Sequence, residues 1–151
     1  MKISVLALTL LLTGCAYLHG IYRDAPTKSF PPPEDVLAVL KQIPEVKTAT
    51  YFAHDGRTPL DRSLGLHKGK VEEFSIRGER TGYNMQFTTR DDRKNITMQM
   101  FTHESRPASF RVEEVRNLMH TVYIALLARF PELPAEQEFH EIAEGLELET
   151  K

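Results

Sequence analysis

Residues 74–100, FSIRGERTGYNMQFTTRDDRKNITMQM, decide the fold. Three times in this stretch, apolar residues alternate with polar or charged ones. The apolar positions are Phe74 and Ile76, then Tyr83, Met85 and Phe87, then Ile96, Met98 and Met100. This alternation is typical of strands with one buried face, and the links between the three runs are short. The stretch therefore predicts an antiparallel meander with one apolar and one polar face.

The flanking segments predict a fourth strand and the helices that cover the apolar face. Residues 46–53 (VKTATYFA) are rich in β-branched and aromatic residues, which favours a strand. Apolar residues at helical spacing predict a helix from Pro33 to Pro44, a long core helix over 109–130 and a short helix over 134–146. We expect an α+β fold: a two-layer domain whose antiparallel four-stranded sheet is covered on one face by helices, in the order α-β-β-β-β-α-α.

The two faces of the predicted sheet allow different interpretations. The polar face carries amides and hydroxyls that form either a binding platform or the solvated side of the fold: Asn84, Gln86, Thr88, Thr97 and Gln99, with Arg77 nearby. The apolar face carries several methionines, which either fill the core or bind soft copper(I): Met85, Met98 and Met100, with Met119 on the covering helix.

The composition excludes several classes of protein. The chain has 151 residues, a formal net charge of −2, 41% hydrophobic residues and one cysteine. It is long enough for one globular domain. A balance this close to neutral argues against a nucleic-acid partner and against a disordered acidic chain. A single cysteine rules out a disulfide framework or a cysteine-rich zinc fold.

The first fifteen residues carry a targeting signal. Lys2 precedes an uncharged, mainly apolar run from Ile3 to Leu12, which is too short to span a bilayer. A basic start, a short apolar run and small residues are typical of a secretory signal peptide. The segment Leu12-Thr13-Gly14-Cys15 resembles the lipobox of bacterial lipoprotein precursors. The structural alternative is an N-terminal core segment that contains a buried cysteine.

The resemblance to the lipoprotein class implies a processing route. In that class the cysteine thiol, here Cys15, receives a diacylglycerol, the peptide is cut before it, and its new amine is acylated. The partner it implies is a membrane, held through lipid on Cys15. Because Ala16 and not Asp follows the cysteine, the sorting rule of enteric-type bacteria places the protein in the outer membrane, facing the periplasm.

These observations predict three segments. We expect a signal peptide over 1–14, a lipidated cysteine and proline-containing tether over 15–33, and one globular domain over 34–151. An extended tether of this kind reaches at most about 55 Å. Some of its apolar residues are expected to pack on the domain or to meet a membrane or partner: Tyr17, Leu18, Ile21, Tyr22 and Phe30.

The loop over 54–70 is the candidate ligand site. Loops of this length are often functional, and this one carries His54, Arg57, Arg62 and His67. Its basic residues suit an anionic partner surface, a lipid headgroup or a glycan. No histidine pair has metal-ligand spacing, and no serine or cysteine has the motif of a catalytic nucleophile. We therefore expect no metal, no cofactor and no enzyme activity.

The sequence thus predicts a lipid-anchored, non-catalytic binding or scaffolding lipoprotein of the bacterial cell envelope. Its partner would be another envelope protein, reached through the long loop, the polar sheet face or a free sheet edge. The alternatives are a small-ligand or metal-binding lipoprotein that uses the 54–70 loop, and a hydrolase of unrecognised type.

Overall fold

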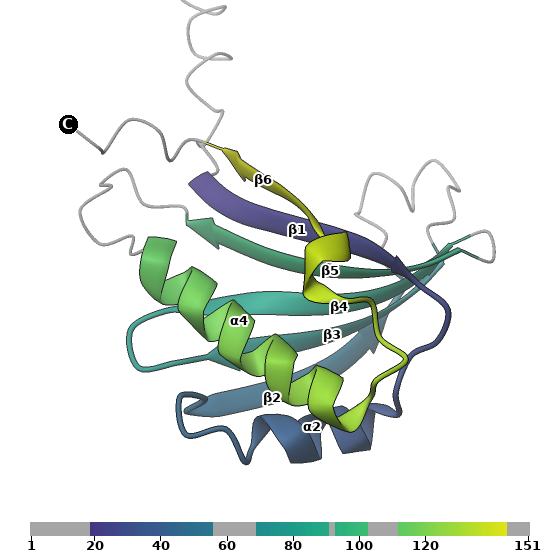
Figure 1. Ribbon diagram of the computed structural model, residues 1–151, viewed down its shortest axis with the longest axis horizontal. Helices are drawn as coiled ribbons and strands as arrows, with labels where there is room; N and C mark the ends of the chain where they lie inside the picture. Colours follow the sequence, from purple (N-terminus) through teal and green to yellow (C-terminus); the bar gives the residue numbers. More distant parts are fainter. Residues whose placement is uncertain (1–18, 56–68, 91–92, 103–111, 145–151) are drawn as a thin grey trace, which may run out of the picture.

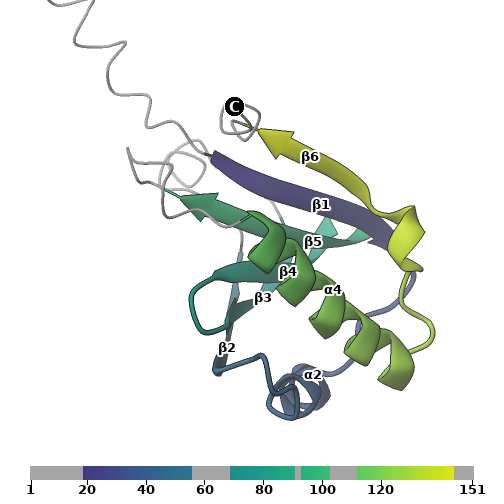
Figure 2. The same ribbon diagram turned by 60° about the vertical axis from the view of Figure 1, so that its left-hand side comes forward.

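The computed structural model describes residues 19–55, 69–90, 93–102 and 112–144. Its strands are β1 (His19–Thr27), β2 (Thr48–His54), β3 (Lys70–Arg77), β4 (Gly82–Arg90), β5 (Arg93–Thr102) and β6 (His140–Glu144). Its helices are α2 (Pro33–Leu40), α4 (Val112–Arg129) and the short 3₁₀ helix η2 (Glu136–Glu138). The six strands form one antiparallel sheet in the order β2-β3-β4-β5-β1-β6. Helices α2 and α4 lie on the same side of it (Figures 1 and 2).

The predicted α+β architecture with an antiparallel sheet is confirmed, and the strand count is wrong. The meander β2-β3-β4-β5 matches the four predicted strands, and helix α2 begins at Pro33 as expected. Two further strands, β1 and β6, extend the sheet beyond β5. The element order is therefore β-α-β-β-β-β-α-η-β instead of α-β-β-β-β-α-α.

The predicted tether is wrong over residues 19–27, because these residues form β1. All nine pair with β5, from His19 opposite Thr102 to Thr27 opposite Lys94. Ile21 and Ala25 point into the core and are 0% exposed. Farther along, the ring of Phe30 stacks on Phe87 with 5.1 Å between centroids. The expectation that apolar residues of this segment pack on the body is thus confirmed for Ile21 and Phe30.

The predicted helix over 134–146 is also wrong. Its residues form η2 and then β6, which pairs with β1 from Gly20 opposite Glu144 to Asp24 opposite His140. A helix of this length is marginal alone in water. The unpaired edge of β1 offers a ladder of backbone hydrogen bonds instead, and Phe139 is buried just before the strand begins.

The core lies between the sheet and the two helices. Residues on the buried face of α4 are Val115, Leu118, Met119, Val122, Tyr123 and Leu126. They pack on the predicted apolar face of the sheet, in which Phe74, Met85 and Met98 are 0% exposed. Met119 is also fully buried, so of the two interpretations of the methionines the structure supports core packing.

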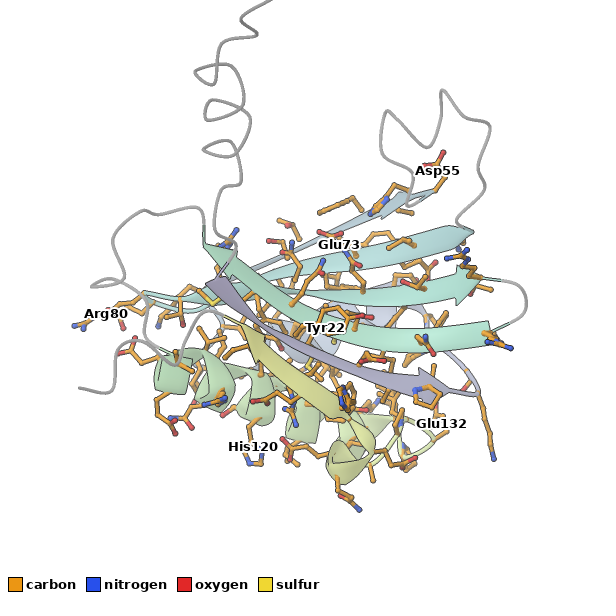
Figure 3. The ribbon with its side chains drawn as sticks, turned by 90° about the horizontal axis from the view of Figure 1, so that it is seen from above. Tyr22, Asp55, Glu73, Arg80, His120 and Glu132 are labelled. Atoms are coloured by element: carbon orange, nitrogen blue, oxygen red, sulfur yellow. The ribbon has the colours of Figure 1, made fainter. Side chains whose placement is uncertain are left out.

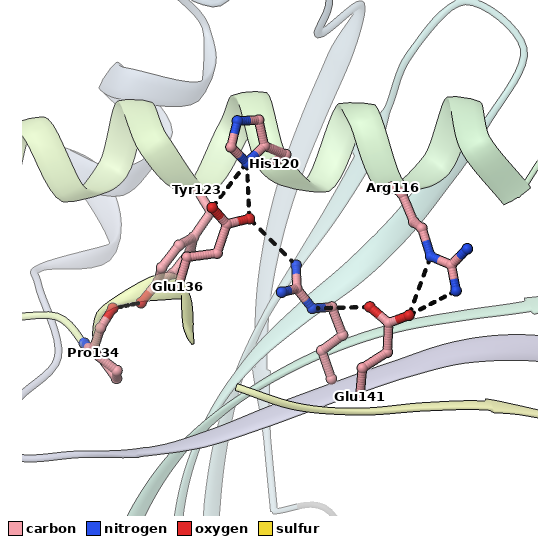
Figure 4. A network of polar contacts seen from close by, with 7 residues as sticks. Arg116, His120, Tyr123, Pro134, Glu136 and Glu141 are labelled. Carbon is pink, nitrogen blue, oxygen red and sulfur yellow. Dashed lines mark hydrogen bonds and ion pairs between the residues drawn. The ribbon is translucent and has the colours of Figure 1, made fainter. Parts of the chain in front are cut away.

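A network of charged side chains holds β1, α4, η2 and β6 together (Figure 4). Glu141 of β6 accepts two hydrogen bonds from Arg116 of α4, at 3.1 Å from Nε and 2.7 Å from Nη2, and lies 3.3 Å from Nε of Arg23. Glu136 of η2 lies 3.6 Å from Nη1 of Arg23 and 2.8 Å from Nδ1 of His120. Arg23 of β1 therefore contacts the carboxylates of both C-terminal elements.

Two tyrosine hydroxyls are buried between the layers. The Tyr123 hydroxyl donates a hydrogen bond of 2.7 Å to the carbonyl oxygen of Pro134. The Tyr83 hydroxyl has no hydrogen-bond partner in the described structure. Burial raises the pKa of both hydroxyls well above the ordinary tyrosine value, because it disfavours the charged tyrosinate.

If β1 is part of the core, shortening Ile21 will destabilise the whole domain. We expect Ile21→Ala to lower the free energy of unfolding by about 2–5 kcal/mol, the usual cost of emptying a buried isoleucine site. Urea denaturation followed by circular dichroism measures it. Lys28→Ala, at an exposed position just after β1, is the matched control and should change little. An Ile21→Ala variant as stable as the parent would contradict the assignment of β1.

The buried tyrosines predict a loss of stability at high pH. Their folded-state pKa values lie above the unfolded value of about 10, so the folded chain keeps protons that the unfolded chain releases, and stability falls as the pH rises beyond about 10. As the pH is raised, the tyrosinate absorbance should therefore show a final increase, beyond the ionisation of the exposed tyrosines, that coincides with unfolding. Tyr83→Phe and Tyr123→Phe should each reduce that step. Full ionisation of every tyrosine in the folded protein would contradict the prediction.

Candidate functional site: the helix-free face of the sheet

The face of the sheet opposite α2 and α4, called here the helix-free face, contains an open hollow of about 700 Å³. Side chains from β1, β4 and β5 line it: Tyr22, Gln86, Thr88, Arg90, Arg93, Asn95, Thr97 and Gln99. These positions alternate with the core residues of the same strands. Four of the five residues predicted for the polar face (Gln86, Thr88, Thr97 and Gln99) are therefore found together in this hollow.

Strand register places the lining side chains in rows across the sheet. Gln86 lies opposite Thr97, and Thr88 lies opposite Asn95. On the next strand, Tyr22 lies opposite Gln99. Thr97 is only 7% exposed and lies at the floor of the hollow, whereas the amides of Asn95 and Gln99 are more accessible. The result is a surface on which amide and hydroxyl groups alternate. The aromatic ring of Tyr22 lies at one side of it.

A buried carboxylate lies beside the hollow. Glu73 of β3 is 7% exposed, and its Oε2 accepts a hydrogen bond of 2.6 Å from Nε2 of Gln86. The same oxygen lies 3.3 Å from Nε2 of His54. In Figure 3, Glu73 and Tyr22 project from the strands, whereas His120 lies with the helical layer. Glu73 thus holds the amide nitrogen of Gln86 in place.

Two arginines stand at the end of the hollow where β4 and β5 meet. Arg90 and Arg93 lie directly opposite each other in the register. Like charges in opposite positions of an antiparallel pair repel each other. In the sequence Asp91 and Asp92 lie between them, so this segment carries charges of both signs.

The sequence-predicted loop site lies mostly outside the described residues. Arg57, Arg62 and His67 belong to the range 56–68, which the structure does not describe. His54 is described at the end of β2, where its ring stacks on Phe52 at 5.9 Å and contacts Glu73. The structure therefore brings His54 to the border of the helix-free face. Within the described ranges no group of three or more histidine, cysteine or acidic side chains is arranged to hold a metal ion.

Several residues of the hollow were not predicted from the sequence. Tyr22 was expected in a tether, and it joins the face only because β1 pairs with β5. Arg93 was expected in the short link before the strand of Ile96, but β5 begins at Arg93. The sequence offers no clean alternation in β1, because charged Arg23 shares a face of the strand with buried Ile21 and Ala25.

A second hollow, of about 750 Å³, opens between the β3–β4 turn and α4. Charged side chains of both signs surround it, including Lys47, Glu79 and Arg80. Among the described residues, the buried polar side chains are Glu72, Glu73 and Thr97, and none of them lines this second hollow. The helix-free face is therefore the better candidate, because it is the surface on which polar groups are built into the sheet.

Comparison with known proteins gives no assignment: no family model, no curated protein and no solved structure matches the chain. In the described part of the chain, none of the helices has the length and apolar character needed to cross a bilayer.

Proposed function

We propose that this chain is a lipid-anchored, non-catalytic binding or scaffolding lipoprotein of the bacterial cell envelope, located on the periplasmic side of the outer membrane. Two features support the proposal. Leu12-Thr13-Gly14-Cys15 supplies the attachment point, with the fatty acids on Cys15. The helix-free face supplies the binding surface. Several acyl chains give durable membrane attachment, whereas one chain binds only marginally.

The observation that carries the binding function is the state of the polar groups in the hollow. Gln86 is held by Glu73, but the side chains of Tyr22, Thr88, Asn95, Thr97 and Gln99 form no hydrogen bond within the described structure. Both helices lie on the other face of the sheet (Figure 2). Three carboxamides and three hydroxyls therefore present donors and acceptors outward from a rigid sheet.

The chemistry of the hollow indicates its partner. Carboxamides and hydroxyls both donate and accept, so they match a neutral polar surface such as the backbone and amide side chains of another envelope protein.

The position of β1 changes the expected distance from the membrane. The described strand β1 includes His19, four residues after Cys15 in the sequence. Four extended residues span at most about 14 Å. The folded domain would therefore be held close to the bilayer surface, not at the distance of about 55 Å that an extended tether over 15–33 allows. A partner of the helix-free face is then expected in or next to the same membrane.

The anchor is tested by Cys15→Ser. We expect the parent protein to fractionate with membranes and to incorporate labelled fatty acid. The variant should do neither. Intact-mass measurement of the purified parent should show cleavage before Cys15 and added acyl chains. An uncleaved, unmodified parent chain would contradict the lipoprotein assignment.

The binding face is tested by site-specific photocrosslinking in cell envelopes. We place a photoreactive amino acid at Gln99 or Thr88 in the hollow, and at Ala128 on the exposed side of α4 as the matched control. Both hollow positions should give the same covalent product with one envelope protein, and Ala128 should not. Adding Thr97→Arg, which fills the floor of the hollow, should remove that product. Products of equal yield from all three positions would contradict the proposed face.

A further inference from the structure

The two edges of the sheet differ in a way that predicts an interaction. Among the described strands, β2 and β6 are the edges of the sheet, because each has one paired neighbour there. Edge strands expose unpaired backbone groups, and monomeric proteins protect them with charges, prolines or bulges. β6 (HEIAE) carries two glutamates in five residues, and Glu141 is tied to Arg23 and Arg116. That edge is protected.

Strand β2 has none of these protections. Its seven residues, TATYFAH, include no lysine, arginine, acid, proline or glycine. Five of the seven are exposed. Phe52 is 45% exposed, and it is one of two large hydrophobic side chains so exposed in the described structure, the other being Ile124 of α4. Helix α2 packs on β2 from the core side, and the described residues place no strand on its outer edge (Figure 1).

From this edge we infer that the chain forms a dimer through antiparallel pairing of β2 with β2 of a second copy, which joins the two sheets into one. The inference goes beyond the proposed function and uses neither the lipid anchor nor the hollow. A second copy is the occupant because β2 is self-complementary. A two-fold axis perpendicular to the sheet at Tyr51 pairs all seven residues and keeps the helical layers of both copies on the same side.

In this register every pair is compatible in size and charge. Ala49 faces Ala53 of the second copy, and the two Tyr51 side chains meet on the axis. Thr50 faces Phe52, a β-branched residue against an aromatic ring, which is a favourable cross-strand pair. Thr48 faces His54. No like charges oppose each other, which they would if two copies of β6 paired with Glu141 and Glu144 in register.

The pairing also removes the exposed ring from solvent. On its own strand the Phe52 ring stacks on His54, at 5.9 Å between ring centroids, and it is still 45% exposed. Across the two-fold axis it gains Thr50 of the second copy as a direct neighbour. Because the contact is confined to one strand of about 23 Å per copy, it lies at the small end of interface sizes, and we expect association that depends on concentration.

Disulfide trapping tests the register. Two differently tagged full-length chains, Thr50→Cys and Phe52→Cys, are mixed and oxidised; the parent chain, with Cys15 as its single cysteine, sets the background. Directly opposite residues have the Cα spacing that a disulfide needs, about 4.5–5.5 Å. We expect the mixed 50–52 product in several-fold excess over 50–50 and 52–52 products. Equal yields of the three products, or none above background, would overturn the inference.

Native mass spectrometry of the purified full chain in detergent tests the dimer itself. The parent should give a dimer whose fraction rises with concentration, Phe52→Lys should give monomer, and Ile124→Lys should behave as the parent. Ile124 is the matched control because it is equally exposed, at 45%, but lies on α4. Circular dichroism establishes that both variants are folded. A parent that stays monomeric at all concentrations, or a dimer that Ile124→Lys disrupts and Phe52→Lys does not, would overturn the inference.

Discussion

The pairing of β1 with β5 is the interaction on which the rest of the structure depends. Nine residues of β1 pair with β5, and five of them pair with β6 on the other side. Without β1, β5 would become an edge and β6 would have no partner in the sheet. β1 also buries Ile21 and Ala25 in the core and brings Arg23 between the carboxylates of Glu136 and Glu141. A segment near the N-terminus thus closes a domain whose last strand comes from the C-terminal part of the chain.

The same pairing creates the candidate binding surface. Residues of β1 alternate between the two faces, so the strand that buries Ile21 must turn Tyr22 outward beside Gln99. Tyr22 therefore borders the hollow only because this strand lies next to the central meander, whose strands β4 and β5 supply the other lining residues. Its polar groups are held on strands that the core fixes from the other side, so their spacing is set by the sheet and not by a loop. A rigid array of this kind favours one partner geometry over others.

The sequence predicts the centre of this fold well and its periphery poorly, for physical reasons. Strands β3, β4 and β5 alternate over most of their central residues and are linked by short turns, so their pairing is local and visible in the sequence. β1 pairs with residues about seventy positions away, and no local pattern encodes that partner. The prolines at 26 and 31–33 made the segment resemble an extended linker, although Pro26 is exposed and Pro31 is buried in the body. The spacing of Phe139, Ile142 and Ala143 within 134–146 suits a helix. In the folded chain this segment instead pairs with the otherwise free edge of β1 and forms strand β6.

The candidate site follows the same division: the amides of β4 and β5 were predicted, and Tyr22, Glu73 and Arg93 required the tertiary pairing.

Amide hydrogen exchange in β1 tests the central claim most directly. If β1 is an inner strand, the amides of residues 21–25 should exchange only on global unfolding, with protection equal to that of β4 and β5. Residues of a proline-containing tether would exchange at the rate of an unfolded chain. Protection in β4 and β5 combined with fast exchange throughout 21–25 would contradict the six-stranded sheet and, with it, the hollow on its helix-free face.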